Sequence, residues 1–241
     1  MKHLHFLAPM VIGVSMTTLL FSCNSGEEKK ADEPAADTTA VKAPEPAAPV
    51  KPANIMIIIH KVANFAKWMP GFEAHDSVRQ AYGLHNNLVA RGTKDSNMVM
   101  VVSRMDDAAK AKEFAALPNL KEVMKKVGVI GAPTISYVDM QMLDTTANGV
   151  SRVLITHQVK DWDAWKKVFD ADKPNRIAAG LTDRALGYSV GDNHSVTMAL
   201  VISDMKKAED FSKSPDLKKK MEDGGVQGPP TFFYYTVIKK Y

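Results

Sequence analysis

The chain of 241 residues contains one pattern of residues twice, and the second occurrence follows the first by 97 positions. The first group is His60, Val62, Trp68, Phe72, Arg79, Gly83 and Leu84, and its counterpart is His157, Val159, Trp165, Phe169, Arg176, Gly180 and Leu181. A later group keeps the offset, with Phe114, Pro118, Leu120, Met124, Gly128, Gly131, Pro133, Thr134 and Tyr137 followed by Phe211, Pro215, Leu217, Met221, Gly225, Gly228, Pro230, Thr231 and Tyr234. Two copies are too few to build a solenoid. The pattern therefore predicts a tandem duplication of one domain, with a first half at 53–147 and a second half at 148–241.

The N-terminal residues 1–22 have the features of a signal peptide. Lys2 supplies a positive start, and the apolar run Met10–Phe21 is too short to span a membrane as a helix. The segment Leu20–Cys23 resembles the lipobox of bacterial lipoproteins, which implies that Cys23, the only cysteine, is lipidated after cleavage and becomes the mature N-terminus. An ordinary signal peptide followed by a chance cysteine is the alternative. We therefore expect an exported protein, anchored through its N-terminal lipid to a membrane of a Gram-negative-type envelope, facing either the periplasm or the surface.

Residues 23–52 are predicted to be a disordered tether. Five prolines lie there among Ala, Glu, Asp, Thr and Lys, with almost no large apolar side chain to offset the entropy of ordering. Such a composition favours an extended, semi-rigid chain that holds the folded part away from a membrane surface.

Within each half the spacing of apolar residues predicts the same order of elements. Ile55–Val62 and Val153–Val159 alternate as strands, and each precedes a cap residue, Asn64 or Asp161, and an aromatic stripe at helical spacing. Pro70 and Pro174 are expected to kink or restart these helices. Two further strands, a second broken helix and a last strand follow in each half. The order β-α-β-β-α-β is the ferredoxin-like arrangement.

An antiparallel sheet with helices on one face needs cover on its other face. That second face carries Ile57 and Ile59 in the first half, and Leu154 and Thr156 in the second. We expect the two halves to press these faces together. The predicted fold is α+β, with two tandem ferredoxin-like repeats that form an intramolecular pseudo-dimeric α/β barrel.

The second half carries the clearest family resemblance. The run His157–Asp170, with Arg176, Ala179–Leu181 and Gly228–Thr231, resembles the dimeric α/β-barrel superfamily, especially small proteins related to antibiotic biosynthesis monooxygenases. The resemblance extends over both halves, from about 54 to 239. It implies a pocket between the helices and the sheet of each half, and a range of activities that includes cofactor-independent monooxygenases, polyketide cyclases and haem-degrading enzymes. Haem is thus a conceivable cofactor, and no other is expected.

His60 and His157 are the first candidate functional residues, since each lies on an apolar strand row. One interpretation is structural, with the ring hydrogen-bonded to the loop that begins the helix. The other is a general base or a haem ligand at the mouth of a pocket. Neither histidine has a second ligand at suitable spacing, so we expect no metal site.

The first helix of each half offers further candidates along one face. Below the aromatic residues, which include Trp68 in the first half and Trp165 in the second, this face presents a charged or titratable pair. The pair is His75 and Arg79 in the first half, and Asp172 and Arg176 in the second. The structural interpretation is an aromatic core, a salt bridge between Asp172 and Arg176, and an Arg79 that snorkels to solvent. The functional interpretation is anion binding by the arginines.

Four polar or aromatic residues occur in one half only, namely Tyr82, His85, Tyr188 and His194. If only one half has kept a working pocket, we expect the difference to appear at these positions.

The net charge of +4 does not indicate nucleic-acid binding. The lysines of 121–126 and 218–220 lie on helix-spaced segments without arginine or aromatic interleaving, so they are expected to form solvated faces. Three functions remain open: a module that binds a small apolar or aromatic ligand unchanged, a cofactor-independent monooxygenase or cyclase, and a structural surface protein whose barrel is filled by side chains.

Overall fold

The computed structural model describes residues 51–241. The predicted signal peptide, the predicted lipidation site Cys23 and nearly all of the predicted 23–52 tether lie outside the described residues. Within 51–241, no helix is both long and apolar enough to cross a membrane.

Over residues 51–241 the chain forms eight strands and eight helices. The first half contains β1 (Ile55–Val62), α1 (Phe65–Ala74), α2 (Asp76–Ala81), β2 (Leu84–Gly92), β3 (Met98–Met105), α3 (Ala108–Ala115), α4 (Leu120–Lys126) and β4 (Val129–Leu143). The second half contains β5 (Ser151–Val159), α5 (Trp162–Ala171), α6 (Lys173–Ala178), β6 (Leu181–Ser189), β7 (Asp192–Ile202), α7 (Met205–Ser212), α8 (Pro215–Asp223) and β8 (Val226–Lys240). The expected β-α-β-β-α-β order is confirmed in each half, with both helices divided in two.

The predicted caps begin the first helix of each half. The side chain of Asn64 accepts a hydrogen bond from the backbone N–H of Lys67 at 3.0 Å, and that of Asp161 accepts one from Ala164 at 2.7 Å. These bonds satisfy one of the free donors of the first helical turn.

The break in this helix does not depend on proline. Pro70 lies inside α1, which continues to Ala74, so the expected interruption at that proline is wrong. The helix breaks at His75 in the first half and at the corresponding Asp172 in the second, where Pro174 does begin the next helix. An interruption at matching positions with and without a nearby proline indicates that packing, rather than the ring of Pro70, fixes it.

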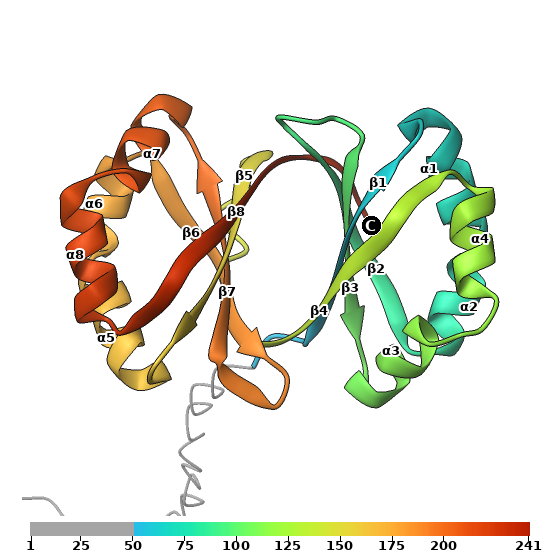
Figure 1. The fold of residues 1–241 in the computed structure, drawn as a ribbon, viewed down its shortest axis with the longest axis horizontal. Helices are drawn as coiled ribbons and strands as arrows, with labels where there is room; N and C mark the ends of the chain where they lie inside the picture. Colours follow the sequence, from blue (N-terminus) through green and yellow to red (C-terminus); the bar gives the residue numbers. More distant parts are fainter. Residues whose placement is uncertain (1–50) are drawn as a thin grey trace, which may run out of the picture. The chain divides into compact units, whose positions relative to one another are not determined.

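The strands form one closed antiparallel barrel in the order β1-β3-β2-β8-β5-β7-β6-β4. The long last strand of each half pairs with one strand of its own half and with one strand of the other half. β4 pairs with β1 of its own half and with β6, while β8 pairs with β5 and with β2. Figure 1 shows the helices on the outer sides of the barrel, with those of each half lying against the strands of that half.

The barrel interior is filled by apolar side chains from both halves. Ile57 and Leu154, each under one-tenth exposed, belong to the same cluster as the fully buried Met100 and Tyr235, and Ile59 packs against it. The expectation that Ile57, Ile59 and Leu154 meet in one core is therefore confirmed.

Candidate functional site

Two cavities lie between the outer face of the sheet and the helices, one in each half. The first has a volume of about 750 Å³ and is lined by residues of β1, α1, α2, β3, α3, α4 and the start of β4. The second has a volume of about 100 Å³ and lies at the equivalent place in the second half. Only the first is within the range of pockets that hold drug-sized molecules.

All eight residues proposed for a pocket line one of these cavities. His60, Trp68, His75 and Arg79 line the first, and His157, Trp165, Asp172 and Arg176 line the second. Alternation along β1 explains the histidine, because Met56, His60 and Val62 point toward the helices while Ile57 points into the barrel.

His60 and His157 have no hydrogen-bond partner among the described residues. Both ring nitrogens of each are covered from solvent, and His60 as a whole is 6% exposed. The expected hydrogen bond to the loop at the helix start is therefore wrong. Each imidazole instead packs against the tryptophan of the following helix, with ring centroids 5.4 Å apart in both halves.

Burial controls the protonation of these rings. Desolvation lowers the pKa of His60 and that of His157 from the ordinary value of 6.5 to about 4. Both imidazoles are consequently neutral at pH 7, and a ring whose conjugate acid is this strong is a weak general base. The arrangement favours a packing role over proton abstraction.

Arg176 in the second half is held by a complete set of partners. Its Nε and Nη2 donate to the two carboxylate oxygens of Asp183 at 2.8 and 2.7 Å, and its Nη1 donates to the carbonyl of Phe169 at 2.6 Å. The guanidinium carbon lies 3.6 Å from the centroid of the Phe169 ring. The expected Asp172–Arg176 salt bridge is therefore wrong, since Asp183 on β6 takes that place.

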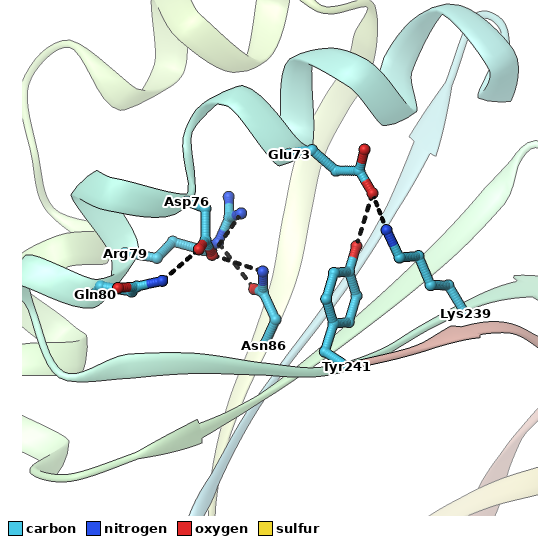
Figure 2. Close-up of polar contacts among 7 residues, drawn as sticks. All are labelled: Glu73, Asp76, Arg79, Gln80, Asn86, Lys239 and Tyr241. Atoms are coloured by element: carbon cyan, nitrogen blue, oxygen red, sulfur yellow. Dashed lines mark hydrogen bonds and ion pairs between the residues drawn. The ribbon is translucent and has the colours of Figure 1, made fainter.

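Arg79 is the counterpart of Arg176, but its partners differ (Figure 2). Its Nε donates to Oδ1 of Asn86 at 3.0 Å, and its Nη2 lies 3.3 Å from Oδ1 of Asp76. The structure gives Nη1 no hydrogen bond among the described residues. Arg79 is only 4% exposed, so the expectation that it snorkels to solvent is also wrong. Asn86 stands where the second half has Asp183, and a neutral amide has replaced a carboxylate.

The walls of the second cavity are bridged by an ion pair that the first lacks. Asp172, 6% exposed, pairs with Lys220 of α8. The corresponding residues in the first half are His75 and Val123, which cannot form this bond. The Asp172–Lys220 pair thus ties helix α8 to the α5–α6 junction across the cavity.

Side-chain volume also differs between the two cavities. The second is lined by Phe232 and Met198 where the first has Ile135 and Val101. At one other position the second half has the smaller residue, Val153 in place of Met56, which leaves more space in the second cavity. The larger residues and the ion pair together account for the smaller second cavity.

One pair of positions exchanges its residues between the halves. Gly71 of α1 faces Val127 at the end of α4, and a Cβ on Gly71 would overlap Cγ1 of that valine. The second half has Val168 and Gly224 at these positions, with the valine on the opposite helix. The helices can therefore pack closely in both halves, each time around one glycine and one valine.

The C-terminal end of the chain adds a contact that only the first half receives (Figure 2). Lys239 pairs with Glu73 of α1, and the Tyr241 hydroxyl lies 3.4 Å from the same carboxylate. This links β8 of the second half to a helix that lines the first cavity.

Asp183, Asn86, Lys220, Ile135 and Phe232 were not among the predicted site residues. The signal that finds them is the list of positions at which the two halves differ under the 97-residue offset. Residues present in one half only were a poor guide: His85 and His194 are exposed and pair with Asp106 and Asp192. Neither they nor Tyr82 and Tyr188 line a cavity.

The residues around His60 do not fit an axial ligand of haem iron. A histidine that ligates a metal ordinarily donates its second ring N–H to a carboxylate, carbonyl or water. Neither ring nitrogen of His60 has such a partner among residues 51–241, and His157 is in the same position.

No family model matches the chain, and no curated protein matches it. Among solved structures, an anthrone oxidase-like protein is similar over 78% of this chain and 92% of its own, with a TM-score of 0.53 and 13% identity. A haem-binding protein from Thermus thermophilus covers the same shares with a TM-score of 0.46 and 10% identity. A ferredoxin-fold protein related to antibiotic biosynthesis monooxygenases, from Listeria monocytogenes, matches over 78% of this chain and 96% of its own, with a TM-score of 0.41 and 7% identity.

At these identities the likeness concerns the fold alone, and the anthrone oxidase-like protein carries that assignment. The α+β fold built on ferredoxin-like elements, which the sequence predicted, is confirmed. Activity does not follow from it, because one fold supports many functions.

Proposed function

We propose that this protein binds a small aromatic or apolar compound, without transforming it, in the cavity of its first half. The cavity of about 750 Å³ is the observation that carries the proposal. A protein with a purely structural role has no need of such a space, and an unfilled apolar cavity costs stability.

The lining suits an aromatic ligand. Trp68, Phe72 and Phe114 contribute flat apolar surface, and Trp68 and Phe72 stack with centroids 5.0 Å apart. A few polar groups, His60, His75 and Arg79, lie among them. Mostly apolar walls with a small number of polar groups are typical of ligand pockets.

A fluorescence titration with the neutral dye N-phenylnaphthylamine tests this proposal. The double variant Val101→Met/Ile135→Phe introduces the residues of the second half and fills the first cavity. We expect the natural chain to bind about one dye per chain and the double variant to lose at least tenfold in affinity, about 1.4 kcal/mol. Phe232→Ile, which leaves the first cavity untouched, is the matched control and should keep full binding. Equal binding by the natural chain and the double variant would contradict the proposal.

A cofactor-independent oxygenase is the second candidate, favoured by a buried neutral His60 in contact with Trp68 at the cavity wall. The similar solved structure of an anthrone oxidase-like protein agrees with it at the level of the fold. The low pKa of His60 favours binding over catalysis, as a weak base removes protons slowly. Oxygen consumption with an anthrone or hydroquinone, abolished in His60→Ala, would favour this candidate instead.

We further propose that the barrel is an intramolecular pseudo-dimer produced by tandem duplication, with one chain supplying both halves. The uniform 97-residue offset supports this. Size measurement in solution at micromolar concentration should give a monomer, and an obligate dimer would show that two chains are needed.

Residues 1–52 support the proposal of a lipid-anchored, exported protein. The chain should partition into the membrane fraction of a Gram-negative host, and Cys23→Ser should release it. Retention of the Cys23→Ser variant in that fraction would refute the anchor.

A further inference from the structure

The first cavity contrasts with the second in the charge of its walls. Its lining includes three permanent cations, Arg79, Lys121 and Lys125, together with His60 and His75, and no carboxylate. The second cavity is lined by Arg176, Lys220 and Asp172, and the last two neutralise each other. An excess of cations around an apolar space favours an anionic ligand, and this holds most for Arg79, which is buried and therefore poorly solvated.

Arg79 is the one of these cations that is buried and incompletely paired. Its counterpart Arg176 directs all three of its terminal nitrogens to protein acceptors, two of them on a single carboxylate. Arg79 has one carboxylate contact, between its Nη2 and the partly exposed Asp76 at 3.3 Å. Its Nε donates to the neutral amide of Asn86. Nη1 of Arg79 has no partner among the described residues, and a guanidinium can donate five hydrogen bonds.

The packing of Arg79 keeps it in place for a ligand. Its guanidinium carbon lies 3.9 Å from the centroid of the Phe72 ring, and the pair with Asp76 and the bond to Asn86 fix its orientation (Figure 2). Asp76 also accepts hydrogen bonds from Gln80 and Asn86, so its charge is shared among several donors. The arginine is therefore held rigidly while it keeps a free donor, which is the arrangement that binds an oxyanion with little loss of side-chain entropy.

We propose that the ligand of the first cavity is a small aromatic acid, whose carboxylate or sulfonate group is bound by Arg79 and whose ring lies against Trp68 and Phe72. Lys121 and Lys125, exposed on α4, also line this cavity and attract the anion over a longer range. This inference rests on the proposed binding function and adds the charge of the ligand to it.

Two dyes of nearly equal shape provide the test. Anilinonaphthalene sulfonate carries a negative charge, and N-phenylnaphthylamine lacks it. We expect the natural chain to bind the sulfonate at least tenfold more tightly at low salt, with the difference reduced at high salt. Arg79→Gln should remove most of this preference by lowering the affinity for the sulfonate about tenfold, with a clearly smaller loss for the neutral dye.

Variants of exposed lysines test the preference for an anion even if Arg79→Gln does not fold. Lys121→Gln/Lys125→Gln should weaken sulfonate binding about two- to fivefold, since exposed charges contribute little each. Lys218→Gln, which changes the counterpart of Lys121 in the second half, is the matched control and should have no effect.

The outcomes separate the two proposals. Equal affinities for the two dyes in the natural chain, both lost in Val101→Met/Ile135→Phe, would overturn the anionic ligand and leave the binding function standing. Binding of neither dye would overturn both. A sulfonate preference that survives in both the Arg79 and the lysine variants would place the anion elsewhere and overturn the assignment to Arg79.

Discussion

The two halves have the same order of strands and helices, but the cavity between sheet and helices differs in volume. The second half fills it with Phe232 and Met198 and bridges it with Asp172–Lys220, whereas the first half leaves about 750 Å³. The buried arginines of the two halves differ as well. Arg176 is fully paired, with Asp183 as its carboxylate, whereas Arg79 is only partly paired. A few side chains at equivalent positions, rather than any difference in fold, thus separate a half with a small cavity from a half with a large one.

The largest expected effect comes from the arginine partners. Asp183→Ala leaves Arg176 buried without its carboxylate and should lower the free energy of unfolding by about 3–5 kcal/mol. Asn86→Ala removes a single hydrogen bond from Arg79, which keeps Asp76, and should cost about 1–2 kcal/mol. Urea denaturation of both variants measures the difference. Equal losses would mean that the two arginines are held alike and that the comparison fails.

Acid sensitivity should be the same in the two halves, because burial lowers the pKa of His60 and His157 equally, to about 4. The folded state keeps both rings neutral, while the unfolded chain takes up protons below about pH 6.5. This stability is therefore fully present above that pH and is lost as the pH falls toward 4. Each histidine should account for a loss of about 2 kcal/mol between about pH 7 and about pH 5.

Denaturation of His60→Leu and His157→Leu across this range isolates the two contributions. Each variant should lose stability less steeply than the natural chain, and by similar amounts. If His60→Leu retained the full acid sensitivity, water in the larger cavity would be solvating His60, and the comparison of the halves would need revision.

A smaller effect tests the exchanged glycine and valine. Gly71→Val should destabilise the first half by about 1–3 kcal/mol, because its side chain meets Val127. Val127→Gly alone should also be destabilising through lost contacts. The double variant reproduces the pair of the second half. Its loss of unfolding free energy should be at least about 1 kcal/mol smaller than the sum of the losses in the two single variants. Strict additivity would show that these helices do not depend on the exchange.

Much of the fold was predictable because the same residue pattern occurs in both halves of the chain. Alternation along β1 and β5 assigned Ile57 and Leu154 to the interior and His60 and His157 to the helix side, since a strand has only two faces. The helix stripe likewise selected Trp68 and Arg79 as cavity residues, because residues three and four apart share a face.

The partners of the arginines were not predictable in the same way. Asp172 lies four residues before Arg176 on the chain, and the actual partner Asp183 lies on the next strand, beyond a turn. Sequence spacing describes contacts within one helix but not the approach of a helix to a strand. The size of a cavity is harder still, because it depends on many side chains at once, such as Ile135 and Val101 from separate strands.

A crystal structure of the chain soaked with bromonaphthalene tests the central claim most directly, because the anomalous signal of bromine locates the ring without ambiguity. We expect one bromine site per chain, between β1 and the helices α1 and α4, beside Trp68. A site of equal strength beside Trp165, or a site inside the barrel with none beside Trp68, would contradict the claim that the larger cavity of the first half is the ligand site.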